Sequence, residues 1–304
     1  MTMESEKWKA SIIERAMRRE RIADKAIENS PKPLLSSPDV VQTVDFVFSS
    51  IKPLNRIGDS GPLLLAKWKP DRSRRYLVKH AYTDCAANEF VYTKLVQAMG
   101  TKMPDVVLFQ LSEGEKRNYF KTEYIIGLKY LDLEIEAPSY QQIRERAINW
   151  DDYFRFRAIY EMFCEGDSFE TPLAKDGYIY RVDTTDAFIL HDAQLACAGI
   201  NINIDGQNAK TNIKQYALSF PYHTCWEYRN FDKQLQSYIE RYGNECVDPY
   251  LEPFSRIQEI PCDYIDDFLN TLCYFYPDFI GDYFKLFIAA LQKKSNEYLK
   301  TRKL

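Results

Sequence analysis

The stretch 75–100 constrains the fold more than any other, because a short strand pattern runs directly into a helix pattern. The run Tyr76–His80 alternates between two faces, as a β-strand does. Apolar residues then recur at helical spacing until Gly100, which is a natural residue for a helix C-terminus. We expect a strand that ends near Lys79, followed by a helix that carries Glu89 in its first two turns.

The composition describes a chain with enough apolar residues for a substantial core. The chain has 304 residues, of which 45% are hydrophobic, so one large domain or two lobes can form. The net charge of −4 argues against a broad nucleic-acid-binding face. No apolar run reaches the roughly 18 residues of a membrane span, and the N-terminus lacks the apolar region of a secretory signal.

The cysteines are odd in number and scattered, with no C-x-x-C motif. This pattern favours neither a zinc site nor a disulfide framework. We therefore expect a cytoplasmic protein in a reducing compartment, while export as a secreted effector stays open.

The segments before residue 75 predict a helix, two strands and a loop. An amphipathic helical extension is expected over residues 1–34, a strand over Asp39–Pro53 and a second strand over Leu63–Lys69. The turn-rich loop between the strands contains Gly58 and Gly61. Its backbone N–H groups could cover phosphate groups, but a plain hairpin turn fits the same residues.

After Gly100 the pattern changes from strands to helices. Strands are expected over Val106–Leu111 and Asn118–Ile126, and Gly127–Leu133 would cross into a helical region that includes a core helix over Ile148–Cys164. An extended crossover offers backbone groups to the edge of a base. If the bound ligand is a nucleotide, its adenine is expected near three residues: Glu123, Tyr124 and Ile125.

The second informative stretch is 165–188, which predicts a hairpin with an aspartate on each side. Asp176-Gly177 is a hairpin turn, and Tyr178–Val182 is a strand that delivers Asp183 into a loop. Asp167 lies before the hairpin. Two carboxylates in this layout allow one to face a substrate hydroxyl while the other holds Mg²⁺.

The order of these pieces resembles the HipA-like kinases and, more distantly, the phosphoinositide lipid kinases, over Gln42–Phe188. The matching pieces are YLVKH, NEFVYTKLVQAMG, EGD and YRVDTTDAF. The resemblance implies an α+β, two-lobed, protein-kinase-like fold. It divides the chain into a helical extension (1–34), a nucleotide-binding lobe (35–130) and a helical lobe (131–304) with its catalytic-type loop at 165–188. It also implies roles for four residues: Lys79 binds phosphate, Glu89 orients that lysine, Asp167 is the base and Asp183 binds the metal.

The chain departs from the family in the catalytic loop. The family has Asp-Arg-His-x-x-Asn, whereas this chain has Asp167-Ser168-Phe169-Glu170-Thr171-Pro172. Proline cannot replace the metal-binding Asn, so Glu170 or Asp186 is a candidate oxygen ligand in its place. A second register is open, in which Thr184-Thr185-Asp186 matches the family's Asn-Thr-Asp and Asp205 binds the metal.

Three functions therefore compete. The first is an ATP- and Mg²⁺-dependent phosphotransferase, with a protein Ser or Thr as one candidate acceptor. The second is a pseudokinase, or nucleotide-binding regulator, that acts through a partner without phosphoryl transfer. The third is an unrelated α+β interaction protein in which Lys79, Glu89, Asp167 and Asp183 are ordinary surface or structural residues.

Overall fold

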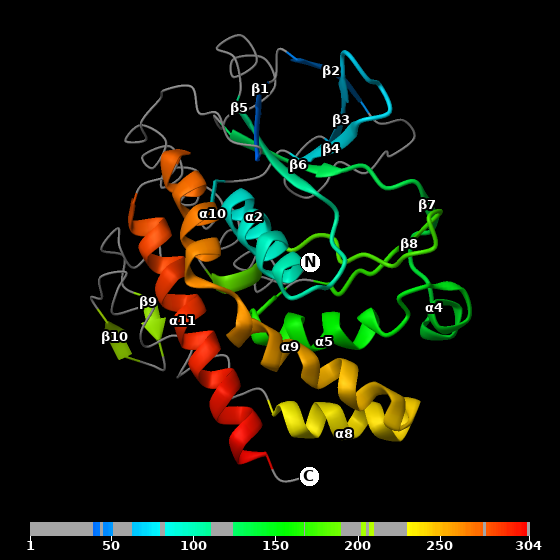
Figure 1. Cartoon of the computed structure of the whole chain (residues 1–304), viewed down its shortest axis with the longest axis vertical. Coiled ribbons are helices and arrows are strands. Elements are labelled where there is room, and N and C mark those ends of the chain that lie inside the picture. The colour runs from blue at the N-terminus through cyan, green and yellow to red at the C-terminus, as the bar shows by residue number, and fades with distance from the viewer. Residues whose placement is uncertain are drawn as a thin grey trace, which may run out of the picture.

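The chain forms a sheet-containing lobe and a helical lobe that pack against each other (Figure 1). The computed structural model describes residues 39–42, 45–50, 63–79, 83–110, 124–166, 168–189, 202–204, 207–209, 230–275 and 278–302. The α+β, two-lobed fold expected from the sequence is confirmed. The helical extension expected over residues 1–34 lies outside the described residues.

Among the described elements, every helix except α2 follows the six strands of the main sheet in the chain. The strands are β1 (Val40–Gln42), β2 (Phe46–Ser50), β3 (Leu63–Trp68), β4 (Arg75–Lys79), β5 (Val106–Gln110), β6 (Tyr124–Lys129), β7 (Leu133–Ile135), β8 (Leu173–Ala174), β9 (Ile202–Ile204) and β10 (Gln207–Ala209). The helices are α2 (Thr83–Ala98), α4 (Tyr140–Arg146), α5 (Asp152–Met162), α8 (Phe231–Tyr242), α9 (Val247–Glu259), α10 (Cys262–Phe275) and α11 (Asp278–Thr301), with short 3-10 turns η2 (Ala187–Ile189) and η4 (Asn244–Cys246).

The main sheet is strongly curled. Its strand order is β1-β5-β6-β4-β3-β2, so β1 and β2 are the two edges, yet only residues 43–45 separate them. An extended chain from Gln42 to Phe46 spans at most about 14 Å, whereas a flat sheet of this width would place its edges about 24 Å apart. The expected single strand over Asp39–Pro53 is therefore wrong: the segment breaks into two short strands on opposite edges.

A small aromatic core fills the concave side of the curled sheet. The ring of Phe109 on β5 lies 5.0 Å from that of Phe46 and 5.9 Å from that of Tyr76, both in edge-to-face geometry. Phe46 lies on β2, which is not a neighbour of β5 in the sheet, so this contact crosses the inside of the curl. Alternation along β5 then sends Val106 and Leu108 to the other face, into the larger core that contains α2.

Gly127 lies inside the central strand β6, not at the start of the crossover. It pairs with Val78 and Val107, and a Cβ atom at this position would lie 2.3 Å from Cε2 of Phe109. The glycine thus marks a close approach of the Phe109 ring to the backbone. The expected end of the strand at Ile126 is wrong, and the crossover shortens to Tyr130–Asp132.

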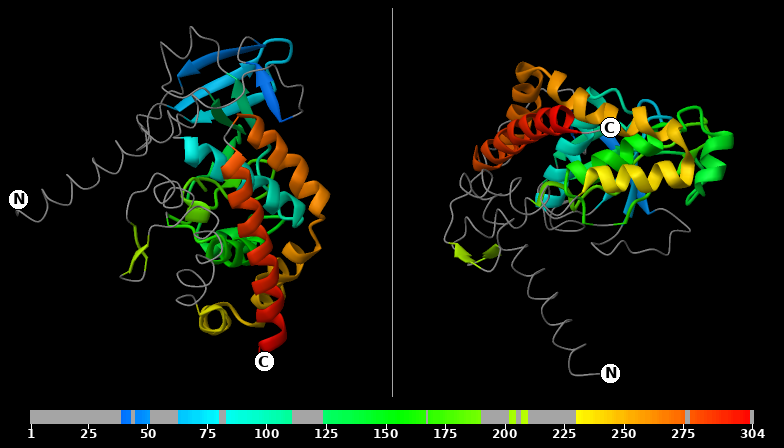
Figure 2. Two further views of the ribbon diagram at one scale, coloured as in Figure 1. Left: turned by 90° about the vertical axis from the view of Figure 1, so that its left-hand side faces the viewer. Right: turned by 90° about the horizontal axis from the view of Figure 1, so that it is seen from below.

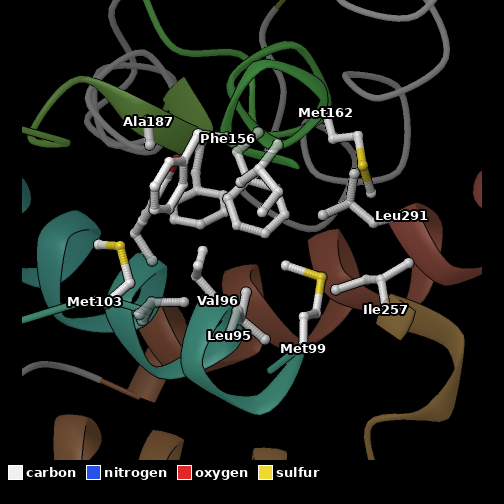
Figure 3. Packing of buried hydrophobic residues seen from close by; sticks show 14 of the residues in the cluster. Leu95, Val96, Met99, Met103, Phe156, Met162, Ala187, Ile257 and Leu291 are labelled. Carbon is white, nitrogen blue, oxygen red and sulfur yellow. The ribbon is translucent and has the colours of Figure 1, made fainter. Parts of the chain in front are cut away.

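Most of helix α2 is buried. Between Ala86 and Val96 only Lys94 is partly exposed, and the helix packs against the sheet, η2 and α10. Its C-terminus is the expected one: Gly100 has φ +81°, and the Thr101 N–H donates to the Val96 carbonyl in a Schellman motif. Figure 3 shows the apolar contact between α2 and the helical lobe, with these residues labelled: Leu95, Val96, Met99, Met103, Phe156, Met162, Ala187, Ile257 and Leu291.

The helical lobe is built around α5, which packs on α9, while α11 packs on α9 and α10 (Figures 1 and 2). Helix α5 begins at Asp152, four residues later than expected. The side chain of Asn149 instead forms two hydrogen bonds with the backbone of Ile179, which ties the start of α5 to the hairpin. Within the described residues, no helix has the length and apolar character needed to cross a membrane.

We expect Gly127→Ala to destabilise the protein by about 1–3 kcal/mol, because the added methyl group overlaps the Phe109 ring in a packed core. The measurement is the free energy of unfolding in urea. Gly166→Ala is the matched control: a Cβ there meets nothing within 4 Å, so a change within about 0.5 kcal/mol is expected. Equal effects of the two substitutions would contradict the close approach at Gly127.

Candidate functional site

Lys79 and Glu89 come from adjacent elements, as the sequence predicts. Lys79 is the last residue of β4 and is the cross-strand partner of Ile126, whose side chain lies in the core shared with α2. The Lys79 side chain lies outside the described atoms. Glu89 on α2 is 1% exposed. A carboxylate buried to this degree requires a cation or hydrogen-bond donors to offset the loss of hydration.

The hairpin that follows α5 is confirmed at its turn. Gly177 has φ +85°, and the Asp176 carboxylate accepts hydrogen bonds from the Tyr178 N–H and the Tyr180 hydroxyl. The two arms pair through isolated bridges, of which one joins Glu170 to Val182. Tyr178–Val182 is thus an arm of the hairpin but not the continuous strand that we expected.

The crossover from the first lobe runs beside this hairpin. It leads into β7, which pairs with β8 in the first arm, and the Lys175 N–H donates to the Asp132 carbonyl. Strand β8 therefore lies between β7 and the second arm. The hairpin thus lies next to the crossover in space, although α4 and α5 separate them in the sequence (Figure 1).

Arg181, on the second arm of the hairpin, is among the largest fully buried side chains of the described residues, with 0% of its side chain exposed. It forms an ion pair with Glu165, which is 2% exposed. The same guanidinium donates to three backbone carbonyls, those of Ser168 and Glu170 at 3.1 Å and that of Val182. One side chain therefore joins the end of the α5 segment to both arms of the hairpin.

Phe169 packs against two guanidinium groups. The Cζ atom of Arg157 lies 3.7 Å from the ring centroid and that of Arg181 lies 5.1 Å from it. Tyr153 and Tyr160 on α5 contact the same ring edge-to-face. Phe169 occupies the position where the family loop has His, so this residue anchors the loop to α5 by packing and cation–π contacts.

Asp183 lies at the open end of the hairpin in a left-handed backbone conformation, with φ +60°. Among the described residues, the only other non-glycine residues with positive φ are Cys164 and Phe188, which flank the same loop. Such backbone costs about 1–3 kcal/mol unless its surroundings hold it, and it clusters at functional sites.

The loop after Asp183 is joined to α2. Asn88, the neighbour of Glu89, donates from Nδ2 to the Thr185 carbonyl at 2.8 Å. The Phe188 N–H donates to the Phe163 carbonyl, so the other end of this loop is bound to the end of α5. The segment that carries Asp183 is thus held between α2 and α5.

Burial sets the charge states of the polar groups beneath this loop. Burial raises the pKa of the Tyr92 hydroxyl well above its usual range, and the negative charge of Glu165 raises it further, so Tyr92 stays neutral. Burial alone would lower the pKa of Arg181, but Glu165, Tyr92 and Asp183 together outweigh it and the net pKa is raised. Arg181 therefore stays protonated across the physiological pH range.

Three expected site residues lie on segments that are linked in the structure. The loop after Asp183 is bonded to α2, which carries Glu89, and the arm before Asp183 pairs with the arm of Glu170. Tyr124 and Ile125 are the first residues of β6, where they pair with Gln110 and Phe109. Four expected residues lie outside the described part: Gly58, Gly61, Glu123 and Asp167.

A metal site is not evident from the described side chains alone, since they contain no group of three His, Cys, Asp or Glu residues placed to hold an ion. Sequence reasoning also missed Arg181, which organises the loop. Its one sequence signal is its position two residues before Asp183, and nothing local to YRVD distinguishes a buried arginine from a surface one.

Comparisons with known proteins give likenesses in structure but not in sequence. No protein-family model matches the chain, and no curated protein matches it by sequence. Among solved structures, the chain is similar to the Helicobacter pylori proinflammatory kinase CtkA, with a TM-score of 0.49 and 11% sequence identity, over 87% of this chain and 100% of that one. The two-lobed fold assignment rests on the strand order and helix packing described above.

We expect Arg181→Met to destabilise the protein by about 3–5 kcal/mol, because the substitution leaves the Glu165 carboxylate buried without its cation. Urea unfolding measures this change. The control is Arg144→Met, which removes an ion pair between Arg144 and Glu245 whose side chains are 44% and 39% exposed. That loss should cost no more than about 1 kcal/mol. A similar small cost for Arg181→Met would show that Glu165 is not buried as an ion pair.

Proposed function

We propose that the chain is an ATP- and Mg²⁺-dependent phosphotransferase of the HipA-like type. The observation that supports this best is the hydrogen bond from Asn88 to Thr185, because it joins the helix of Glu89 to the loop of Asp183. Strand β4, which ends at Lys79, pairs with β6, and β6 packs against α2. The expected glutamate therefore lies on α2, the expected aspartate lies on a segment bonded to α2, and the expected lysine lies on the strand beside β6.

The residues present fit such a ligand in their chemistry. Carboxylate oxygens are the ligands that Mg²⁺ prefers, and Mg²⁺ commonly takes only one or two of them together with phosphate oxygens. Asp183 and Glu170 supply them in this proposal, from opposite arms of the hairpin. When bound, Mg²⁺-ATP supplies the phosphoryl group for transfer. Lys79 then binds phosphate, Glu89 orients Lys79, and Asp167 accepts the proton of the acceptor hydroxyl.

The adenine position moves in this proposal. It was expected near Glu123, Tyr124 and Ile125, but β6 continues to Lys129 and the extended crossover is Tyr130–Asp132. We place the adenine edge beside this crossover, where backbone groups follow the end of the strand. The glycine loop containing Gly58 and Gly61 remains the candidate cover for the phosphates.

A second candidate function is a nucleotide-binding regulator without phosphoryl transfer. Two loop positions that are polar in the family are used for packing in this chain. The Phe169 ring contacts Arg157 and Arg181, and Pro172 is buried with its carbonyl accepting from the Tyr180 N–H. Neither side chain can ligate a metal or transfer a proton.

We expect Mg²⁺-ADP to raise the melting temperature of the wild-type protein, because a ligand that binds only the folded state stabilises it by RT ln(1 + [L]/Kd). At a concentration of 100 Kd this amounts to about 2.7 kcal/mol. Lys79→Met and Asp183→Asn should each abolish most of the shift. Lys129→Met is the control, since Lys129 is an exposed lysine on β6 with a surface ion pair to Asp105.

Transfer of labelled phosphate from ATP separates the two candidate functions. The phosphotransferase should label itself or an added protein acceptor, and Asp167→Asn should remove the label while keeping the thermal shift. A wild-type thermal shift without label transfer supports the regulator. If Mg²⁺-ADP gives no shift in the wild-type protein, neither nucleotide function holds.

A further inference from the structure

Arg181 is connected to the two segments that carry the candidate aspartates. Glu165 and Ser168 flank Asp167 in the sequence, and both accept a hydrogen bond from Nη2 of Arg181. Val182 precedes Asp183, and its carbonyl accepts from Nη1. The Glu170 carbonyl on the opposite arm accepts from the same nitrogen. The guanidinium thus fixes the backbone beside both positions.

The stability of the fold does not explain why this ion pair is buried. Removing two charges from water costs as much as their attraction returns, and well-packed apolar residues in place of a buried ion pair are often neutral or stabilising. What an apolar pair cannot provide is four hydrogen bonds in a fixed planar geometry. What Arg181 contributes is therefore the fixed relative position of the Glu165 carboxylate and three backbone carbonyls around this loop.

Few other side-chain contacts could supply this geometry. The family loop has Arg and His after its aspartate, whereas this chain has Ser168 and Phe169. Phe169 holds the loop to α5 through its ring and forms no hydrogen bond through its side chain. The Ser168 hydroxyl donates to Glu170 within the same exposed loop. Among the described contacts, the link between the two arms at their open end comes from Arg181 and one backbone bridge.

We propose that Arg181 is a positioning residue that sets the distance between the Glu165–Glu170 segment and Asp183. The functional consequence rests on the proposed function: the ligand pair of Glu170 and Asp183 keeps its separation only while Arg181 joins the two arms. Arg181 itself touches neither nucleotide nor metal in this role.

The test is the double variant Glu165→Leu/Arg181→Met, which removes both charges and fills their volume with apolar groups. We expect a cooperative thermal transition like that of the wild-type protein. Amide hydrogen exchange, resolved by residue, then measures how readily the backbone hydrogen bonds of the hairpin open. The Val182 N–H, bonded to the Glu170 carbonyl, should exchange at least about tenfold faster. The Ala174 N–H, bonded to the Tyr178 carbonyl near the turn, is the internal control and should change less than about twofold.

Two further variants make the result decisive. Arg144→Met/Glu245→Leu removes an exposed ion pair between α4 and η4 and should leave the Val182 N–H unchanged. Arg181→Lys keeps the charge opposite Glu165, but it donates from one nitrogen and cannot reproduce the four bonds. It should also accelerate Val182 exchange, and it replaces the double variant if that protein does not fold. Unchanged exchange at Val182 in the folded variant overturns the proposal.

The functional consequence has its own measurement. With ADP held constant, a Mg²⁺ titration followed by thermal shift should require about tenfold more Mg²⁺ in the double variant than in the wild-type protein. Faster Val182 exchange with an unchanged Mg²⁺ requirement overturns the link between Arg181 and the ligand pair. Absence of any Mg²⁺-ADP shift in the wild-type protein refutes the proposed function instead, and the exchange result alone then decides the role of Arg181 in the loop.

Discussion

The structure depends on the burial of α2. A helix of this length normally keeps one polar face in water, but here the sheet, η2 and α10 cover most of it, and between Ala86 and Val96 only Lys94 is partly exposed. The polar residues Asn88, Glu89 and Thr93 are consequently buried as well. Burying them costs free energy unless they find partners. Asn88 finds one in Thr185, so the same packing that joins the two lobes also joins α2 to the loop of Asp183.

Local patterns were sufficient to predict the elements with a clear period, and insufficient where long-range pairing decides. The alternation before Lys79 and the helix up to Gly100 are as expected. The prediction of a single strand over 39–53 was wrong because β1 pairs with β5 and β2 pairs with β3, and no local sequence signal indicates these partners. Gly127 was placed at the start of the crossover because its role, which is to leave room for the Phe109 ring, exists only in the folded sheet. Helix α9 was not expected, since Pro249 and Pro253 interrupt its pattern.

The candidate site shows the same division. Glu89 and Asp183 are predicted from the resemblance and Glu170 from its place in the loop, and all three stay predictions. Arg181 and Glu165 were missed because their importance comes from burial, from the ion pair between them and from the bonds of Arg181 to three backbone carbonyls. In the sequence, Phe169 indicates only that the His of the family pattern is absent. In the structure, its ring packs on α5 and anchors the loop there.

The backbone at Asp183 bears on whether the loop has a chemical role. Aspartate tolerates the left-handed conformation better than most residues, but the conformation still has a cost, and phenylalanine at position 188 tolerates it less well. Hydrogen bonds to three carbonyls hold the stretch from Val182 to Phe188. Arg181 donates to the Val182 carbonyl, Asn88 donates to that of Thr185, and the Tyr283 hydroxyl donates to that of Phe188. Three separate segments therefore constrain one short stretch and hold the Asp183 backbone in one conformation. If Asp183 binds Mg²⁺ as proposed above, these constraints would orient its carboxylate.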